Sequence, residues 1–178
     1  MISEQISEQT EKKLKEIIAQ YPDPKSTVIA ALYLVQEEKG YLSNEAMLWV
    51  AEKLDLPAVR VKEVATFYSM FRQQAVGKYH IQLCRTLSCM VTGSKALLEK
   101  IKTRLKLRPH EVSADGMWSY EEVECLGSCG SGPAMLINDT LFEHLTPEKL
   151  NNIINRIEAE QPDLSYSTLK ETLGQGLK

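Results

Sequence analysis

The 178-residue sequence predicts an α+β protein in which an N-terminal helical bundle precedes an α/β domain. Before about residue 75, apolar residues recur three and four positions apart, which is helical spacing. After Gly77 the period changes, because the segment KYHIQLC alternates apolar and polar residues as a strand does. We therefore expect a helical region at 1–75, an α/β domain at 76–160, and a polar, mobile tail at 161–178.

Four helices are expected in the first region. Pro22 breaks the first, Gly40 ends the second, Ser43 caps the third, and the fourth follows Pro57. Their predicted buried stripes are Leu14, Ile17, Ile18 and Tyr21; Val28, Ala31, Leu32 and Val35; Met47, Val50, Ala51 and Leu54; and Val61, Val64, Ala65 and Tyr68. The aromatic group Phe67, Tyr68 and Phe71 has the same spacing, which favours packing over a redox role.

The second region alternates strand and helix patterns. The expected elements are strand 78–84, a helix after Gly93, strand 117–125, strand 133–139, a returning strand within 140–145, and a final helix. The final helix is the clearest, since Thr146 is a good N-cap and Pro147 suits the first helical position. This order predicts a compact α/β domain with its sheet between helices.

Composition narrows the possible functions. With 21 basic and 24 acidic residues the net charge is −3, which argues against a nucleic-acid-binding protein. The longest uncharged apolar run, residues 28–35, is too short to cross a bilayer. The polar N-terminus lacks the pattern of a signal peptide, so we expect a cytoplasmic protein with reduced thiols.

The four cysteines form two close pairs. Cys84 and Cys89 follow the first expected strand, and Cys125 and Cys129 follow the second. If these strands pair side by side, both pairs meet at one edge of the sheet, where four thiolates could hold a two-iron cluster. A structural zinc site also uses four cysteines, although its gaps are usually two residues and here they are four and three. Uncoordinated thiols are the third alternative, but no C-x-x-C redox motif is present.

The surroundings of the second pair are rich in glycine. Gly127, Gly130 and Gly132 would let backbone N–H groups turn toward sulfur without an obstructing side chain. None of the three histidines has metal-ligand spacing to a cysteine, so each is interpreted as a surface or partly buried polar residue. The acidic run before Cys125 is interpreted as a solvated strand edge.

These motifs resemble a known family. C-x4-C, followed by CLGSC with Pro133 four residues on, is similar to the small [2Fe–2S] subunit (E-type) of NADH:quinone oxidoreductase, respiratory complex I. The segments VATFYSMF, GKYHIQLC and FEHLTPEKL look like the same family. The resemblance extends from Leu14 to Ile157.

The resemblance implies a thioredoxin-like ferredoxin domain with one [2Fe–2S] cluster. Cys84 and Cys89 would ligate one iron, and Cys125 and Cys129 the other. The implied partner is the F-type flavoprotein subunit, which binds NADH and FMN, beside other iron–sulfur subunits of the peripheral arm. The complex would lie on the cytoplasmic face of the inner membrane, with no direct membrane insertion by this chain.

The sequence contains no nucleotide-binding motif of its own, since G-x-G-x-x-G and the phosphate-binding loop are both missing. We therefore expect the isolated chain to carry single electrons without oxidising NADH. Two alternatives stay open: the equivalent subunit of an NAD-linked hydrogenase or formate dehydrogenase, and a zinc-stabilised interaction module.

Overall fold

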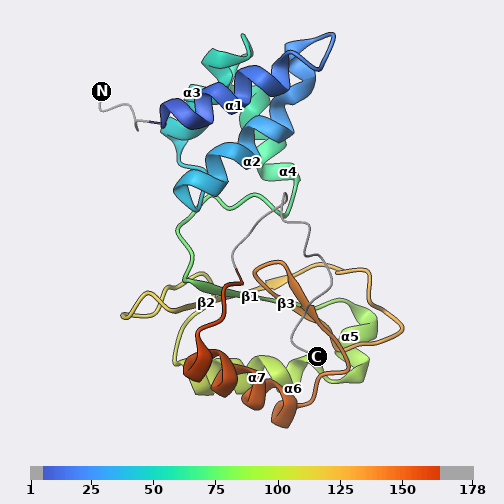
Figure 1. The fold of residues 1–178 in the computed structure, drawn as a ribbon. Helices are drawn as coiled ribbons and strands as arrows, with labels where there is room; N and C mark the ends of the chain where they lie inside the picture. Colours follow the sequence, from blue (N-terminus) through green and yellow to red (C-terminus); the bar gives the residue numbers. More distant parts are fainter. Residues whose placement is uncertain (1–5, 165–178) are drawn as a thin grey trace. The chain divides into compact units, whose positions relative to one another are not determined.

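A computed structural model describes residues 6–164 (Figure 1). The chain divides into two compact units, Met1–Ala75 and Val76–Lys178, which are described separately. Most of the expected tail, residues 165–178, lies outside the described residues. No helix within residues 6–164 is long and apolar enough to cross a membrane.

The first unit is helical, as expected. Its elements are α1 (Glu8–Ile18), the short 3-10 helix η1 (Pro24–Thr27), α2 (Val28–Lys39), α3 (Asn44–Lys53) and α4 (Ala58–Phe67). Ser7 and Ser43 cap α1 and α3 by accepting hydrogen bonds from backbone N–H groups three residues on. Gly40 ends α2 with a φ of 82°, a left-handed conformation that favours glycine.

The core of this unit combines apolar side chains from all four α-helices, including Leu14, Leu32, Val50 and Val61. Phe71 is also buried, with its ring centroid 5.1 Å from that of Tyr33.

Three aromatic residues depart from expectation. Tyr21, expected in a buried stripe, is 46% exposed because α1 ends at Ile18. Tyr68 is 36% exposed, since its extended backbone leaves the helix there, and Phe67 is 79% exposed. The prediction of a packed aromatic group was therefore right only for Phe71.

The second unit contains a four-stranded sheet in the order β2-β1-β3-β4. The strands are β1 (Tyr79–Cys84), β2 (Trp118–Val123), β3 (Met135–Ile137) and β4 (Thr140–Phe142). β1 and β2 are parallel, whereas β3 and β4 join as an antiparallel hairpin. The helices are α5 (Leu87–Thr92), α6 (Ser94–Leu105) and α7 (Pro147–Glu160).

The two long helices of this unit cover the same face of the sheet (Figure 1). Tyr79 and Ile81 of β1 share one buried cluster with Leu97 of α6 and Ile154 of α7. The expected arrangement, a sheet between helices, is therefore wrong. The reason lies in the strands, because the opposite face of β1 carries polar residues that an apolar helix face would not match.

His80 lies on that opposite face and is only 2% exposed, so its interpretation as a surface or partly buried residue is wrong. The Ser119 hydroxyl accepts a hydrogen bond from Gly77 N–H and lies 2.8 Å from His80 Nδ1. His80 Nε2 lies 3.1 Å from the Glu121 carboxylate, which also accepts a hydrogen bond from Gln82. Pairing of β1 with β2 thus satisfies the buried imidazole at both nitrogens.

Candidate functional site

The parallel pairing of β1 and β2 brings their carboxyl ends together. Cys84, the last residue of β1, lies opposite Val123, the last residue of β2, and Arg85 N–H continues the ladder to the Val123 carbonyl at 2.9 Å. Cys125 follows two residues after Val123. Both cysteine-bearing loops therefore leave the sheet at the same edge.

The four thiols come together at this edge as two pairs. Cys84 and Cys89 are buried, at 1% and 2% exposure, and their thiols hydrogen-bond to each other. Cys125 and Cys129 are exposed, with their sulfurs 3.4 Å apart. The two pairs are close enough that charge on Cys84 opposes the ionisation of both Cys125 and Cys129. Within residues 6–164, no three or more His, Cys, Asp or Glu side chains form a group that could hold a single metal ion.

Backbone amides point at the buried pair. Burial opposes ionisation of Cys84, but hydrogen bonds from the hydroxyl and amide of Thr86 and the amide of Leu126 outweigh it and lower its pKa. Burial raises the pKa of Cys89, against a hydrogen bond from the Ala134 amide.

In the exposed pair, as in the buried one, the pKa of the first cysteine is lowered and that of the second is raised. The Gly127 amide, whose nitrogen lies 3.4 Å from Cys125 Sγ, lowers the pKa of Cys125. The neighbouring Cys125 raises the pKa of Cys129. Gly127 has a φ of 81°, so the expected role of this glycine in turning an amide toward sulfur agrees with the geometry. In each pair, the first cysteine is the readier to become a thiolate.

Two hydroxyl residues at the site were missed by the sequence reasoning. Thr86 Oγ1 lies 3.2 Å from Cys84 Sγ and also hydrogen-bonds to the Cys125 thiol. Ser88 hydrogen-bonds to the Cys129 thiol. Residues that follow Cys84 therefore contact the sulfurs of both Cys125 and Cys129. In the sequence, the only sign of these contacts is that Thr86 lies two residues after Cys84.

The second loop packs against the first through glycine. A Cβ added at Gly132 would lie 3.1 Å from Thr92 Oγ1 and 3.4 Å from Cys89 Sγ. Gly130 has no atom within 4 Å of such a Cβ. Of these two glycines in the loop, Gly132 is therefore the one that close approach requires.

The short helix α5 differs from expectation, since Cys89 was placed before the first helix of this unit and lies within α5 instead. Beside Cys89, α5 exposes three aliphatic side chains, Leu87 at 77%, Met90 at 57% and Val91 at 80%. We call these three residues the α5 patch. Such a concentration on six residues is typical of a surface that a partner covers.

The charges near the cysteines are paired. Arg85 donates to the Glu124 carboxylate from Nε at 3.0 Å and from a terminal nitrogen at 2.5 Å. Glu121 is turned toward His80 and only 22% exposed, so the interpretation of the acidic run as a solvated edge is wrong for this residue.

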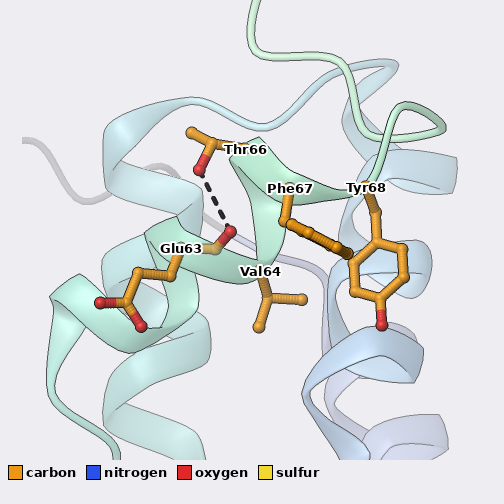
Figure 2. A pocket seen from close by; sticks show the side chains of 5 residues that line it. All are labelled: Glu63, Val64, Thr66, Phe67 and Tyr68. Carbon is orange, nitrogen blue, oxygen red and sulfur yellow. Dashed lines mark hydrogen bonds between the residues drawn. The ribbon is translucent and has the colours of Figure 1, made fainter.

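The first unit contains a hollow of its own. It is lined by Glu63, Val64, Thr66, Phe67 and Tyr68 at the end of α4 (Figure 2). Thr66 Oγ1 donates to the Glu63 carbonyl at 3.1 Å, which closes the last turn of the helix. The hollow offers no cluster of ionisable groups, and hence no chemistry comparable to that of the thiols.

The four thiols and the amides around them fit an iron–sulfur cluster. Thiolates are the ligands that such clusters use, and N–H donors to sulfur stabilise their negative charge. Two pairs at one edge can each chelate one of two irons. When bound, such a cluster supplies one-electron transfer at a potential set by its hydrogen bonds and exposure.

Comparisons with known proteins agree with this chemistry. The family described as thioredoxin-like [2Fe-2S] ferredoxin matches residues 14–158. The E-type subunit of the NADH-quinone oxidoreductase of Rickettsia bellii is 40% identical over 146 residues, which cover 80% of this chain and 87% of the relative. An E-type subunit of the same enzyme in Rhizobium meliloti is 35% identical over 150 residues, covering 84% and 89%.

Among solved structures, a crystal structure of an NAD+-reducing [NiFe]-hydrogenase in the H2-reduced state is similar in fold. The TM-score is 0.65 at 24% identity, over 76% of this chain and 23% of that chain. At this identity the likeness concerns the fold alone.

Proposed function

We propose that this chain, which belongs to the thioredoxin-like [2Fe-2S] ferredoxin family, is the E-type electron carrier of an NADH-quinone oxidoreductase. It carries one [2Fe–2S] cluster. Cys84 and Cys89 ligate one iron, and Cys125 and Cys129 ligate the other. The observation that carries this assignment is the meeting of both cysteine pairs at one edge of the β1–β2 ladder.

The two cysteine pairs would hold the cluster in different surroundings, one buried and one exposed. Cys84 and Cys89 are buried and fixed by the amides of Leu126 and Ala134, so they form the rigid half. Cys125 and Cys129 are exposed on the loop, so they form the half nearest to solvent or to a partner. Electrons would therefore enter and leave on the side of the second pair.

The proposed partner is the F-type flavoprotein, which binds NADH and FMN. The hydride chemistry then takes place on that partner, and this chain takes up one electron at a time. We place the flavoprotein on the α5 patch, because these exposed aliphatic side chains share a helix with Ser88, which hydrogen-bonds to the Cys129 thiol of the exposed pair. The assembly would be peripheral, on the cytoplasmic face of the inner membrane, beside other iron–sulfur subunits of the peripheral arm.

Serine substitution tests the ligand assignment. Replacing any of the four cysteines should abolish or shift the EPR signal of the reduced cluster, since serine oxygen is a harder ligand than thiolate sulfur. An unchanged signal in Cys129→Ser would contradict the assignment. Zinc bound in place of iron would instead favour a structural module.

Association with the flavoprotein tests the partner surface. Val91→Glu should weaken binding to the co-expressed flavoprotein by about thirtyfold, as expected when a buried interface anchor of about 2 kcal/mol is lost. Leu141→Glu is the matched control, because Leu141 is 43% exposed on β4. Equal binding by both variants would exclude the α5 patch. Binding to a hydrogenase or formate dehydrogenase flavoprotein, but not to that of the quinone-reducing enzyme, would favour the alternative complex.

The proposal also predicts that the purified chain alone does not oxidise NADH. Appreciable NADH turnover without the flavoprotein would contradict the proposal that the hydride chemistry takes place on that partner.

A further inference from the structure

The loop that carries the exposed cysteine pair has little internal support. Ser131 N–H donates to the Ser128 carbonyl at 3.1 Å, and the Ser131 hydroxyl lies 3.4 Å from the same carbonyl. These contacts close one turn, but they connect residues of the loop only to each other. The position of Cys129 within this turn must therefore be set from outside the loop.

Besides the hydrogen bond from Ser88 to the Cys129 thiol, the segment that follows β4 supplies contacts from outside the loop. His144 N–H donates to the Ser131 carbonyl at 2.7 Å, and Leu145 N–H donates to the Pro133 carbonyl at 3.2 Å. The Glu143 carboxylate accepts hydrogen bonds from the hydroxyls of Ser131 and Ser128. These two serines lie two residues after Cys129 and one residue before it, respectively.

Glu143 is itself held in place. Lys149 Nζ donates to the Glu143 carbonyl at 2.7 Å, and the buried Leu145 anchors the same segment two residues on. Hydrogen bonds from Ser131 and Ser128 lower the pKa of Glu143, so the side chain is a carboxylate at neutral pH. A carboxylate accepts from two hydroxyls at once, and such charge-assisted bonds are the stronger ones.

We propose that Glu143 is a positioning residue for Cys129: its carboxylate holds Ser128 and Ser131 and thereby fixes the turn from which the Cys129 sulfur projects. This inference rests on the proposed role of Cys129 as a cluster ligand. Glu143 acts on the sulfur through the two serines. A loose turn would let Cys129 leave its iron more often, so the cluster would be lost more easily.

The test compares variants of the full, cluster-loaded chain. Glu143→Ala removes the acceptor, Glu143→Gln keeps an acceptor oxygen without the charge, and Glu148→Ala is the control at an exposed carboxylate in the first turn of α7. Two quantities are measured: the rate at which a ferrous chelator removes iron from the reduced chain, and the EPR line positions.

Glu143→Ala should release iron at least about tenfold faster and shift the EPR lines, as expected for the loss of a charge-assisted hydrogen bond. Glu143→Gln should stay within about threefold of wild type with an unchanged spectrum, because it keeps an acceptor oxygen, and the control should match wild type. Wild-type behaviour of Glu143→Ala overturns the inference. Equal damage by Gln and Ala also overturns it, because the acceptor oxygen that Gln keeps for the serine hydroxyls would then make no difference.

If Glu143→Ala does not fold, Ser131→Ala tests the same contact from the other side. It should speed iron release, and unchanged release would overturn the inference. Wild-type chain that binds no iron would overturn the proposed function and this inference with it. Iron-loaded chain that is insensitive to these substitutions would overturn only the role of Glu143.

Discussion

The hydroxyl of Thr86 offers a direct test of how the protein sets the potential of the cluster. Thr86 Oγ1 lies 3.2 Å from Cys84 Sγ and also hydrogen-bonds to the Cys125 thiol. Thr86→Val removes this hydroxyl with little change in shape. The substitution keeps the Thr86 backbone amide that donates to Cys84, and the hydroxyl makes no capping bond to α5 that could be lost.

The expected effect follows from charge. Reduction adds one negative charge to the cluster, so hydrogen bonds to its sulfurs stabilise the reduced state more than the oxidised one. A hydrogen bond to a charged group contributes about 1.5–3 kcal/mol. The reduction potential changes only by the difference between the strength of this bond in the reduced cluster and its strength in the oxidised cluster. If that difference is about a third to a half, Thr86→Val lowers the potential by roughly 20–60 mV, since a tenfold change in a one-electron equilibrium is about 59 mV.

The assay is a potentiometric titration followed by EPR, on wild type, Thr86→Val and Thr86→Ser. The serine variant keeps the hydroxyl and should stay within about 10 mV of wild type, well below the shift expected for valine. A valine variant with the wild-type potential would refute the reasoning. So would a serine variant that shifts as far as valine, because the effect would then come from the lost methyl group.

Two further predictions concern packing and pH. Gly132→Ala should shift the EPR signal and destabilise the chain by about 1 kcal/mol, because the new methyl group crowds Thr92 Oγ1 and presses on Cys89 Sγ. Gly130→Ala meets no atom within 4 Å and should leave both the signal and the stability unchanged. Glu38 accepts hydrogen bonds from the amide and hydroxyl of Ser7; burial opposes its ionisation, but these and other hydrogen bonds lower its pKa from 4.5 to about 2. Because the folded pKa is lowered, this stabilisation is full above pH 4.5 and disappears as the pH falls through about 2. Glu38→Gln should therefore lose about 1 kcal/mol of unfolding free energy at pH 7, after allowance for solvent screening, and almost none at pH 2 in urea titrations. A loss independent of pH would contradict the assignment.

Most helices and strands could be predicted from local signals, although α5 was missed. Ser43, Gly40 and Thr146 sit where helices begin or end, and strand alternation identified β1. The placement of both cysteine pairs at strand ends also indicated that the pairs would meet if β1 and β2 lay side by side, as they do. Hydrophobic periodicity and capping chemistry are short-range properties, so the sequence alone reports them well.

Features that depend on contacts between distant segments could not be predicted. Alternation places His80 outward, but its burial depends on Ser119 and Glu121, about forty residues later on the paired strand. Likewise, Glu143 reaches the cysteine loop only because β4 returns beside it. The partial exposure of Tyr68 follows from a helix that ends one residue earlier than its apolar pattern suggests.

The central claim is that the four cysteines hold one two-iron cluster. The most direct measurement is the visible spectrum of anaerobically purified chain, with iron and acid-labile sulfide counted and EPR recorded before and after reduction. The account predicts red-brown protein with about two irons and two sulfides per chain and an EPR signal that appears only on reduction. A colourless protein with about one zinc per chain would contradict it and make the cysteines structural.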